Sequence, residues 1–359
     1  MMKQIYTRLK PIITSVLAGL VGLAGGAIIM ALWGYPPIAA YQAVFSSVFG
    51  SLYGFGSTLA QATPLILTGL TFAIGVRGGL FNIGAEGQMF LGAIGAVAVS
   101  LISLPVGLHL IVALLAGMLA GALWSMPASI LKTTRGIHEV ISTIMLNWIA
   151  LYLGMYLVID WLGDPGRAEK SISAAPTARL PGMLSGTSLT YALVVSVIFA
   201  LIMFFLVWKT TLGFELRVVG QNPGAANYAG INENFSVHST FILGGMAAGL
   251  AGALQIVGHP PTFALYADFS TVRNLGFDGI GVALIGRNHP IGVIFAAIFF
   301  AGLNVGARTM QITAGVPLEM VRIIQGVIVI ALAAPELLDF WSKLIPGIRN
   351  WIGELKGSS

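Results

Sequence analysis

Long apolar runs recur along this chain and leave little sequence between them. They cover residues 12–33, 58–76, 86–104, 109–131, 140–159, 190–208, 237–257, 275–286, 290–310 and 318–334. Most are close to the ~20 residues that a helix needs to cross a bilayer. Charged residues form 9% of the chain, whereas soluble domains carry roughly 25%. We therefore predict an all-α membrane protein, a polytopic transmembrane helical bundle of about ten spans.

A polar, glycine-rich segment, Gly78–Gln88, interrupts this pattern between the second and third runs. A carboxylate at membrane depth, such as that of Glu86, costs about 2.5–3.5 kcal/mol and marks a functional site. Irregular backbone is tolerated in a bilayer only where it is buried in protein or lines a cavity. The segment therefore predicts a broken helix beside a polar pathway.

A second segment, Leu275–Ala283, echoes the first. Paired spans interrupted by glycine in corresponding halves of a chain point to a transport site. We expect both broken helices near the centre of the bundle. In the predicted topology they enter from opposite sides of the membrane, as in an inverted repeat.

Five polar residues are candidates for lining a substrate pathway: Asn82, Glu86, Gln88, Asn147 and Asp278. Each has a structural alternative. Acidic side chains are favoured at helix N-termini, and Asn and Gln form hydrogen bonds between membrane helices. Both interpretations stay open from the sequence alone.

The basic residues predict the orientation. Twelve of the 18 Lys and Arg residues fall in segments that this topology places in the cytoplasm, and six fall outside, in agreement with the positive-inside rule. Both termini are then cytoplasmic. We expect a transmembrane domain over residues 1–335, with the first apolar run retained as a helix, and a cytoplasmic tail over 336–359.

Two connecting segments are long. The outer one, 160–190, has the composition of an ordinary surface loop. The cytoplasmic one, 209–235, predicts two short helical stretches split at Asn222-Pro223-Gly224. The second stretch, near 225–229, is too short to be stable alone. It suits docking into a groove on another protein.

Other classes of chemistry lack their residues. The chain has no cysteine, and its five histidines never fall four residues apart, so we expect no metal site. It has no glycine-rich nucleotide-binding loop ending in Gly-Lys-Ser/Thr, and no nucleophile–base pair. We expect no cofactor and no enzymatic activity.

The chain resembles the permease subunits of bacterial ABC importers of the branched-chain amino acid and simple sugar class. It is most similar to the nucleoside-type permeases that work with basic-membrane-protein lipoproteins. The resemblance covers roughly residues 10–335 and is carried by Gly78–Gln88, Glu139–Asn147 and Gly220–Ile231.

The resemblance implies three partners: a separate ATPase, a second related permease, and an extracellular lipid-anchored binding protein that delivers the substrate. It implies a coupling helix in the 209–235 loop, with ATPase-coupling positions at Glu215, Gly220, Ala225, Ala226 and Gly230. It also implies the cytoplasmic membrane of a bacterial cell.

A nucleoside substrate would need hydrogen-bonding groups and aromatic faces on its pathway. Asn82, Asn147 and Asp278 can supply the former, and Phe81 and Trp148 the latter. The alternatives are a simple sugar or branched-chain amino acid permease of the same kind. A further alternative is an ion-coupled transporter with Glu86 as its ion site.

Overall fold

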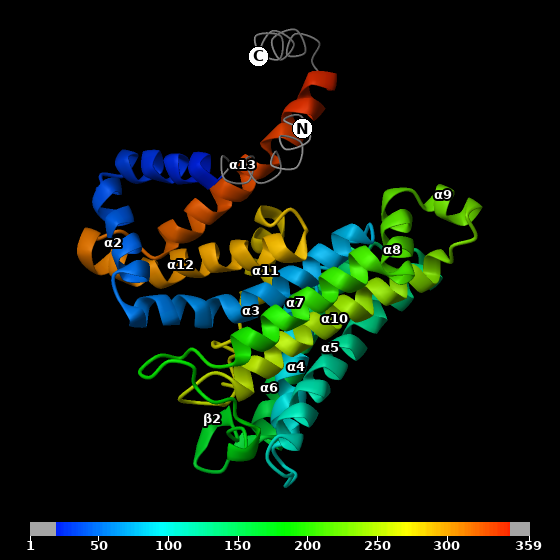
Figure 1. The fold of residues 1–359 in the computed structure, drawn as a ribbon, viewed down its shortest axis with the longest axis horizontal. Helices are drawn as coiled ribbons and strands as arrows, with labels where there is room; N and C mark the ends of the chain where they lie inside the picture. The colour runs from blue at the N-terminus through cyan, green and yellow to red at the C-terminus, as the bar shows by residue number, and fades with distance from the viewer. Residues whose placement is uncertain (1–18, 345–359) are drawn as a thin grey trace. The chain divides into compact units, whose positions relative to one another are not determined.

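The computed structural model describes residues 19–344 (Figure 1). The chain divides into two compact units. The first holds residues 1–43 and 307–359, and the second holds residues 44–306. The boundaries fall inside α2 (Pro37–Phe49) and α12 (Pro290–Ala314). The predicted cytoplasmic tail lies largely outside the described residues.

The first unit is held by glycines on the helix Gly19–Leu32, which face α13 (Glu319–Leu344). A Cβ on Gly22 would lie 2.6 Å from the Cα of Ile328, so only glycine allows this approach. The Tyr41 hydroxyl donates to the Leu23 carbonyl at 2.6 Å. Since α13 runs to Leu344, the domain boundary that we placed at 335 lies inside a helix.

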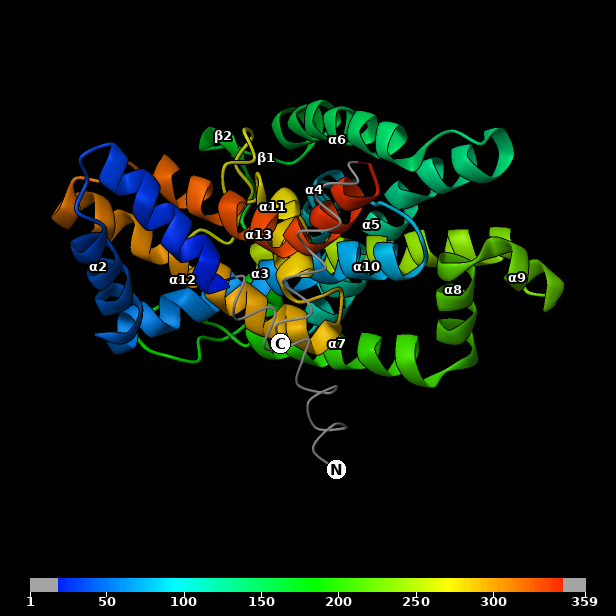
Figure 2. The same cartoon turned by 90° about the horizontal axis from the view of Figure 1, so that it is seen from above.

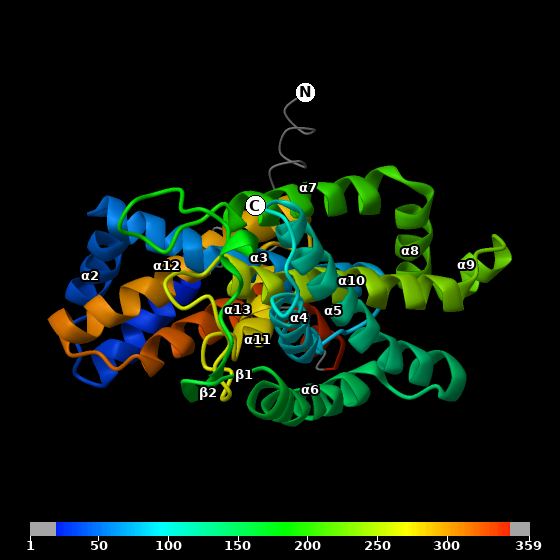
Figure 3. The ribbon, with the colours of Figure 1, turned by 90° about the horizontal axis from the view of Figure 1, so that it is seen from below.

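The second unit contains the elements that build the candidate site. Its helices, besides the parts of α2 and α12, are α3 (Leu52–Arg77), α4 (Ala85–Val99), α5 (Leu108–Arg135), α6 (Glu139–Tyr156, followed by a π-helical turn, Leu157–Trp161), α7 (Ala192–Lys209), α8 (Thr211–Gln221), α9 (Pro223–Tyr228), α10 (Glu233–Val257) and α11 (Leu275–Ile285). Figures 2 and 3 show α10 between α6 on one side and α7 on the other.

Glycines bring α5 and α10 close together at the centre of this unit. Gly117 and Gly121 of α5 face Gly245 and Gly249 of α10, and a Cβ on Gly249 would lie 3.0 Å from the Cα of Gly121. Small residues spaced by four are the usual means of close helix packing in membranes. The buried core of α3, α4 and α10 surrounds this contact.

One end of the unit, the hairpin end, is built from β1 (Gly163–Asp164), β2 (Arg167–Ser171) and a short 3₁₀ helix, Pro176–Ala178. We expected an ordinary surface loop here, and that expectation was wrong. Ser171 is fully buried, and its N–H donates to the Leu265 carbonyl at 2.8 Å. The loop after α10 in turn sends Phe269 inward onto Phe90 of α4, with ring centroids 4.5 Å apart.

At the opposite end, α8 and α9 form an arm that stands apart from the hairpin end in all three views (Figures 1, 2 and 3). The predicted split between two short helices is confirmed. Asn222 ends α8, and its Oδ1 accepts the Ala225 N–H at 3.0 Å, which caps α9. Pro223 at the first helical position fits the same start, since its missing N–H needs no partner there.

The all-α membrane architecture is confirmed, whereas the count of ten spans is not. Six described helices are long and apolar enough to cross a membrane, and four shorter apolar helices accompany them. Among the short ones are α4 and α11, the helices of the two glycine-rich segments. The sequence prediction missed α2, because its Pro-Pro start and mixed composition hide it.

Candidate functional site

The candidate site is centred on the turn that joins α3 to α4, residues 78–84. Gly79 has a φ of +74°, a conformation that glycine adopts at little cost. A Cβ there would lie 2.8 Å from the Cα of Gly220 in α8. The turn therefore depends on glycine twice, once for its own conformation and once for its contact with the arm.

Three amide side chains hold the turn and the start of α4 together. Asn82 Oδ1 accepts the Gly84 N–H at 3.0 Å and the Gln88 side-chain amide at 3.1 Å. From α6, Asn147 accepts the Gly87 N–H and donates to the Ile83 carbonyl, both at 2.9 Å.

The structure thus brings together three of the predicted pathway residues, Asn82, Gln88 and Asn147. These residues are 1–6% exposed, and their hydrogen-bond partners belong to the turn, to the start of α4 or to each other. A buried hydrogen-bonded amide of this kind specifies one backbone arrangement. Their contacts therefore hold the broken helix in place.

Glu86 reaches across to a different helix. One carboxylate oxygen accepts the Gly276 N–H at 2.7 Å, and the other accepts the Asn274 N–H. Glu86 therefore caps the N-terminus of α11, where a negative charge is favoured. The two glycine-rich segments that echo each other in the sequence meet at this carboxylate.

The two broken helices run in opposite directions from this meeting point. α4 ends near the hairpin end, where His109 contacts both the Val99 carbonyl and Thr177. α11 ends near the arm, because the turn that follows it contacts Arg77. This is the relation that the inverted repeat predicted.

Arg77 was missed as a site residue, since the sequence analysis used it only for orientation. Its Nε and Nη2 donate to the carbonyls of Asn288 and Arg287, each at 3.0 Å. Both of these residues have positive φ, +50° and +55°, which is uncommon outside glycine. Arg77 thus holds an irregular turn between α11 and α12.

Aromatic rings surround this guanidinium. The Arg77 Cζ lies 5.4 Å from the ring centre of Trp208 in α7, and Arg217 of α8 lies 5.9 Å from the same ring. His289 contacts Trp208 at 4.7 Å. Burial, and then the charge of Arg77, lower the pKa of His289, so the ring is neutral at pH 7 and adds no repulsion to the cluster.

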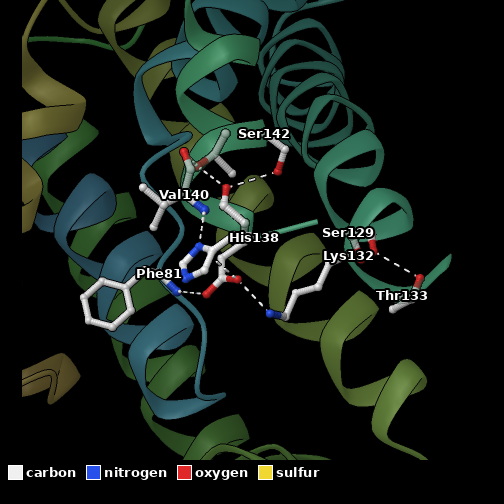
Figure 4. A network of polar contacts seen from close by, with 9 residues as sticks. Phe81, Ser129, Lys132, Thr133, His138, Val140 and Ser142 are labelled. Carbon is white, nitrogen blue, oxygen red and sulfur yellow. Dashed lines mark hydrogen bonds and ion pairs between the residues drawn. The ribbon is translucent and has the colours of Figure 1, made fainter. Parts of the chain in front are cut away.

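Glu139, the first residue of α6, bonds both Phe81 of the turn and Lys132 of α5, two residues that Figure 4 labels. Its Oε1 accepts the Phe81 N–H at 3.2 Å, and its Oε2 accepts from Lys132 Nζ at 2.7 Å. The Glu139 side chain is 5% exposed and that of Lys132 is 30% exposed. The ion pair thus ties the short α5–α6 connection to the turn.

The remaining predicted pathway residues are more exposed than the three amides. Phe81 is 51% exposed and makes an edge-on contact with Phe72 at 5.7 Å. Trp148 is 54% exposed and stacks on Tyr152. Asp278 is half-buried on α11. The structure therefore divides the predicted residues into a buried set and an accessible set.

On the arm, one predicted coupling residue needs correction. Ala226 is fully buried, because α9 folds back on its own chain, so its methyl group cannot contact a partner. Ala225 and Gly230 are exposed, Glu215 and Gly220 are intermediate, and Gly220 faces the turn at Gly79.

The sequence analysis missed the most accessible side chain of the arm. Tyr228, the last residue of α9, is 99% exposed. Beside it, a hollow of about 470 Å³ is lined by Asn227, Gly230, Ile231, Asn232, Glu233 and Asn234. An aromatic side chain beside a polar hollow is suited to contact with another protein.

Within residues 19–344, no group of three or more His, Asp or Glu side chains lies close enough together to hold a metal ion. The chemistry available at the turn and arm is that of positioning helices and binding a partner.

Comparison with known proteins identifies the family of this chain. Residues 54–333 match the family described as the permease component of the branched-chain amino acid transport system. This chain belongs to that permease family. The match covers α3 to most of the described part of α13, and so includes both broken helices and the arm.

Individual relatives cover nearly the whole chain. The guanosine ABC transporter permease protein NupP of Bacillus subtilis is 39% identical over 337 residues, which is 93% of this chain and 96% of the relative. The nucleoside ABC transporter permease protein NupB of Lactococcus lactis is 34% identical, covering 92% of this chain and 93% of its own length.

A third relative differs in its named substrate. The glucose ABC transporter permease protein TsgB13 of Haloferax volcanii is 34% identical, covering 90% of this chain and 87% of its own length. No solved structure matches the chain. The chain is therefore a multi-pass membrane permease, and the sequence resemblance to this class is confirmed.

Proposed function

We propose that this chain is a membrane subunit of an ATP-driven importer of nucleosides in the cytoplasmic membrane of a bacterium. The observation that supports nucleosides as the substrate is the 39% identity to a guanosine permease over 93% of the chain. A second relative, named for nucleosides, matches over a similar length.

The arm is the proposed contact with a separate ATPase. The arm end of the second unit carries six basic residues, one inside α8 and the others at helix ends or connections: Arg217, and Arg77, Lys132, Arg135, Lys209 and Arg287. Cytoplasmic segments collect Lys and Arg, so the arm end faces the cytoplasm, where ATP is found. Tyr228 and Ala225 are the accessible side chains that would meet the ATPase.

The hairpin end then faces outward. We propose that a lipid-anchored binding protein docks on this end and delivers the substrate there. A second related permease would complete the pathway. For both chain termini we propose the cytoplasmic side, on the distribution of Lys and Arg along the sequence.

Contact between Gly220 and Gly79 supports a direct mechanical route. α9 follows α8 after the single residue Asn222, and α8 rests on the turn that starts the broken helix. When the ATPase moves the arm, the turn moves too. Because ATP and the loaded binding protein favour different states, the pathway alternates between outward and inward access.

For substrate contact we propose the accessible set. Phe81 and Trp148 offer aromatic faces on which a base stacks, and Asp278 offers a hydrogen-bond acceptor for ribose hydroxyls. The buried amides keep the turn in place behind them.

A simple sugar permease is the second candidate, because the glucose permease relative is 34% identical over a similar length. A branched-chain amino acid permease is supported by the family description alone. Against an ion-coupled transporter stands Glu86, whose two carboxylate oxygens both accept backbone N–H groups.

The test is uptake of labelled guanosine by cells with and without this chain, its partner subunits being intact. The proposal predicts uptake that requires the chain, survives an uncoupler and stops when ATP is depleted. Uptake that collapses with the uncoupler at constant ATP would contradict it and favour ion coupling.

A further inference from the structure

The short helix α11 begins at the buried Glu86 carboxylate and ends at a turn in which Arg287 is exposed. It has 11 residues and lies among the shorter apolar helices. A helix leaves backbone N–H groups unpaired at its start and carbonyls at its end. Where water is excluded, these groups need partners supplied by the protein. The identity of those partners determines which element α11 moves with.

Two side chains from one short stretch of chain contact the start of α11 and the turn that follows it, while the last carbonyls of α11 accept N–H groups of that turn. Glu86 accepts the N–H groups of Asn274 and Gly276 at the start of α11. Arg77 donates to the carbonyls of Arg287 and Asn288, directly after its end. The negative charge thus meets the positive end of the helix dipole, and the positive charge meets the negative end.

These two side chains bracket the turn, residues 78–84, that contacts the arm. Arg77 is the last residue of α3 and Glu86 is the second residue of α4. Between them, Gly79 touches Gly220 of α8. A displacement of the turn by α8 therefore acts on both attachments of α11 together.

We propose that Arg77 and Glu86 are positioning residues that clamp α11 to the turn, so that α11 follows the turn as one body. The clamp itself is read from the contacts, while its role in transport rests on the proposed function above. Two close packing points are compatible with such coupling: Gly276 lies against the Glu86 backbone and Gly279 lies against Thr68 of α3.

The chain contains no cysteine, so single cysteines report on the clamp without background. Ala283 on α11 is fully buried, and Ala200 on α7 is 1% exposed and serves as the control position. Each is replaced by cysteine in the full chain, in membranes, and treated with a membrane-permeant maleimide. Both cysteines should stay unlabelled when Arg77 and Glu86 are present.

Removing either clamp should expose α11 alone. With Arg77→Met or Glu86→Ala, the Ala283→Cys thiol should become labelled while the Ala200→Cys thiol stays protected. Arg77→Lys, which retains one charged donor, and Glu86→Gln, which retains one acceptor, should give intermediate labelling. They also serve as variants closer to the native fold.

Two outcomes would overturn the clamp. If Ala283→Cys stays protected without Arg77 and without Glu86, packing alone holds α11. If Ala200→Cys is labelled as well, the two residues support the whole fold and have no local role. The labelling needs neither substrate nor ATP, so its failure leaves the proposed function standing, whereas failed guanosine uptake leaves the clamp standing.

Discussion

Gly220 of α8 lies against Gly79 of the turn between α3 and α4 with no side chain between them. A Cβ on Gly220 would lie 2.6 Å from the Gly79 nitrogen, and one on Gly79 would lie 2.8 Å from the Gly220 Cα. Backbone against backbone leaves no flexible group to absorb a movement of the arm. The proposed coupling between the ATPase and the broken helix passes through this contact.

Gly220→Ala is the direct test of that link. The added methyl meets backbone atoms on the turn, so it cannot be accommodated by a rotamer change, and overpacking of this kind costs about 1–3 kcal/mol. We expect the assembled transporter to hydrolyse ATP while nucleoside uptake falls severalfold or more.

Gly224→Ala is the matched control for this substitution. It lies on the same arm, and a Cβ there would meet only the Asn222 Oδ1, at 3.3 Å. Its uptake should stay near the wild-type value. Equal uptake by Gly220→Ala and wild type would show that the contact between Gly220 and Gly79 is not needed for transport.

Tyr228→Ala should weaken assembly with the ATPase. A fully accessible aromatic residue at a partner contact contributes about 2 kcal/mol or more when it is an interface anchor, which corresponds to roughly 30-fold in affinity. The measurement is co-purification of the ATPase with the permease from detergent. Phe214→Ala, at a 57% exposed position of α8, is the control variant.

Undiminished recovery of the ATPase with Tyr228→Ala would contradict the assignment of α9 as the contact. Ala226→Arg is expected to act differently. Because Ala226 is fully buried, arginine there should disrupt the fold of the arm itself, which protease cleavage within residues 209–235 would report.

Asn147→Ala should loosen the start of α4. It removes the acceptor for the Gly87 N–H and the donor to the Ile83 carbonyl, and an unpaired buried polar group costs about 1–3 kcal/mol. We expect a lower midpoint of thermal unfolding in detergent. Met145→Ala, at a 60% exposed position of the same helix, should leave that midpoint nearly unchanged, and an equal loss in both would refute a special role for Asn147.

Glu139→Ala should impair transport more than Lys132→Met. The first leaves the Phe81 N–H without its side-chain acceptor and also removes the ion pair, whereas the second removes the ion pair and keeps that hydrogen bond. Uptake rates at saturating substrate would check the order, and the reverse order would show that the charge pair, and not the turn contact, is what matters.

Local patterns in the sequence predicted the elements that depend on neighbouring residues. The apolar runs indicated the helices, and Asn222-Pro223-Gly224 indicated the split between α8 and α9, because capping and proline act within a few residues. The spacing of Gly117 and Gly121, and of Gly245 and Gly249, is also local and is typical of the close helix contact that the structure contains.

Local patterns could not predict contacts between segments that are far apart in the sequence. That Glu86 caps α11 depends on a partner 188 residues away, and that Arg77 binds the turn after α11 depends on one 211 residues away. The burial of Ala226 and the exposure of Tyr228 depend on how α9 folds back. The echo between the two glycine-rich segments was the only signal that pointed across this distance.

The measurement that tests the central claim most directly is competition for labelled guanosine uptake, carried out in ATP-loaded cells that express this chain with its partner subunits. Excess unlabelled nucleosides, ribose, glucose and leucine are compared as competitors. For a nucleoside importer, we expect excess unlabelled nucleosides to abolish uptake of the label and ribose, glucose and leucine to leave it unchanged. Loss of uptake with a sugar or with leucine at the same concentration, or uptake that does not need this chain, would contradict it.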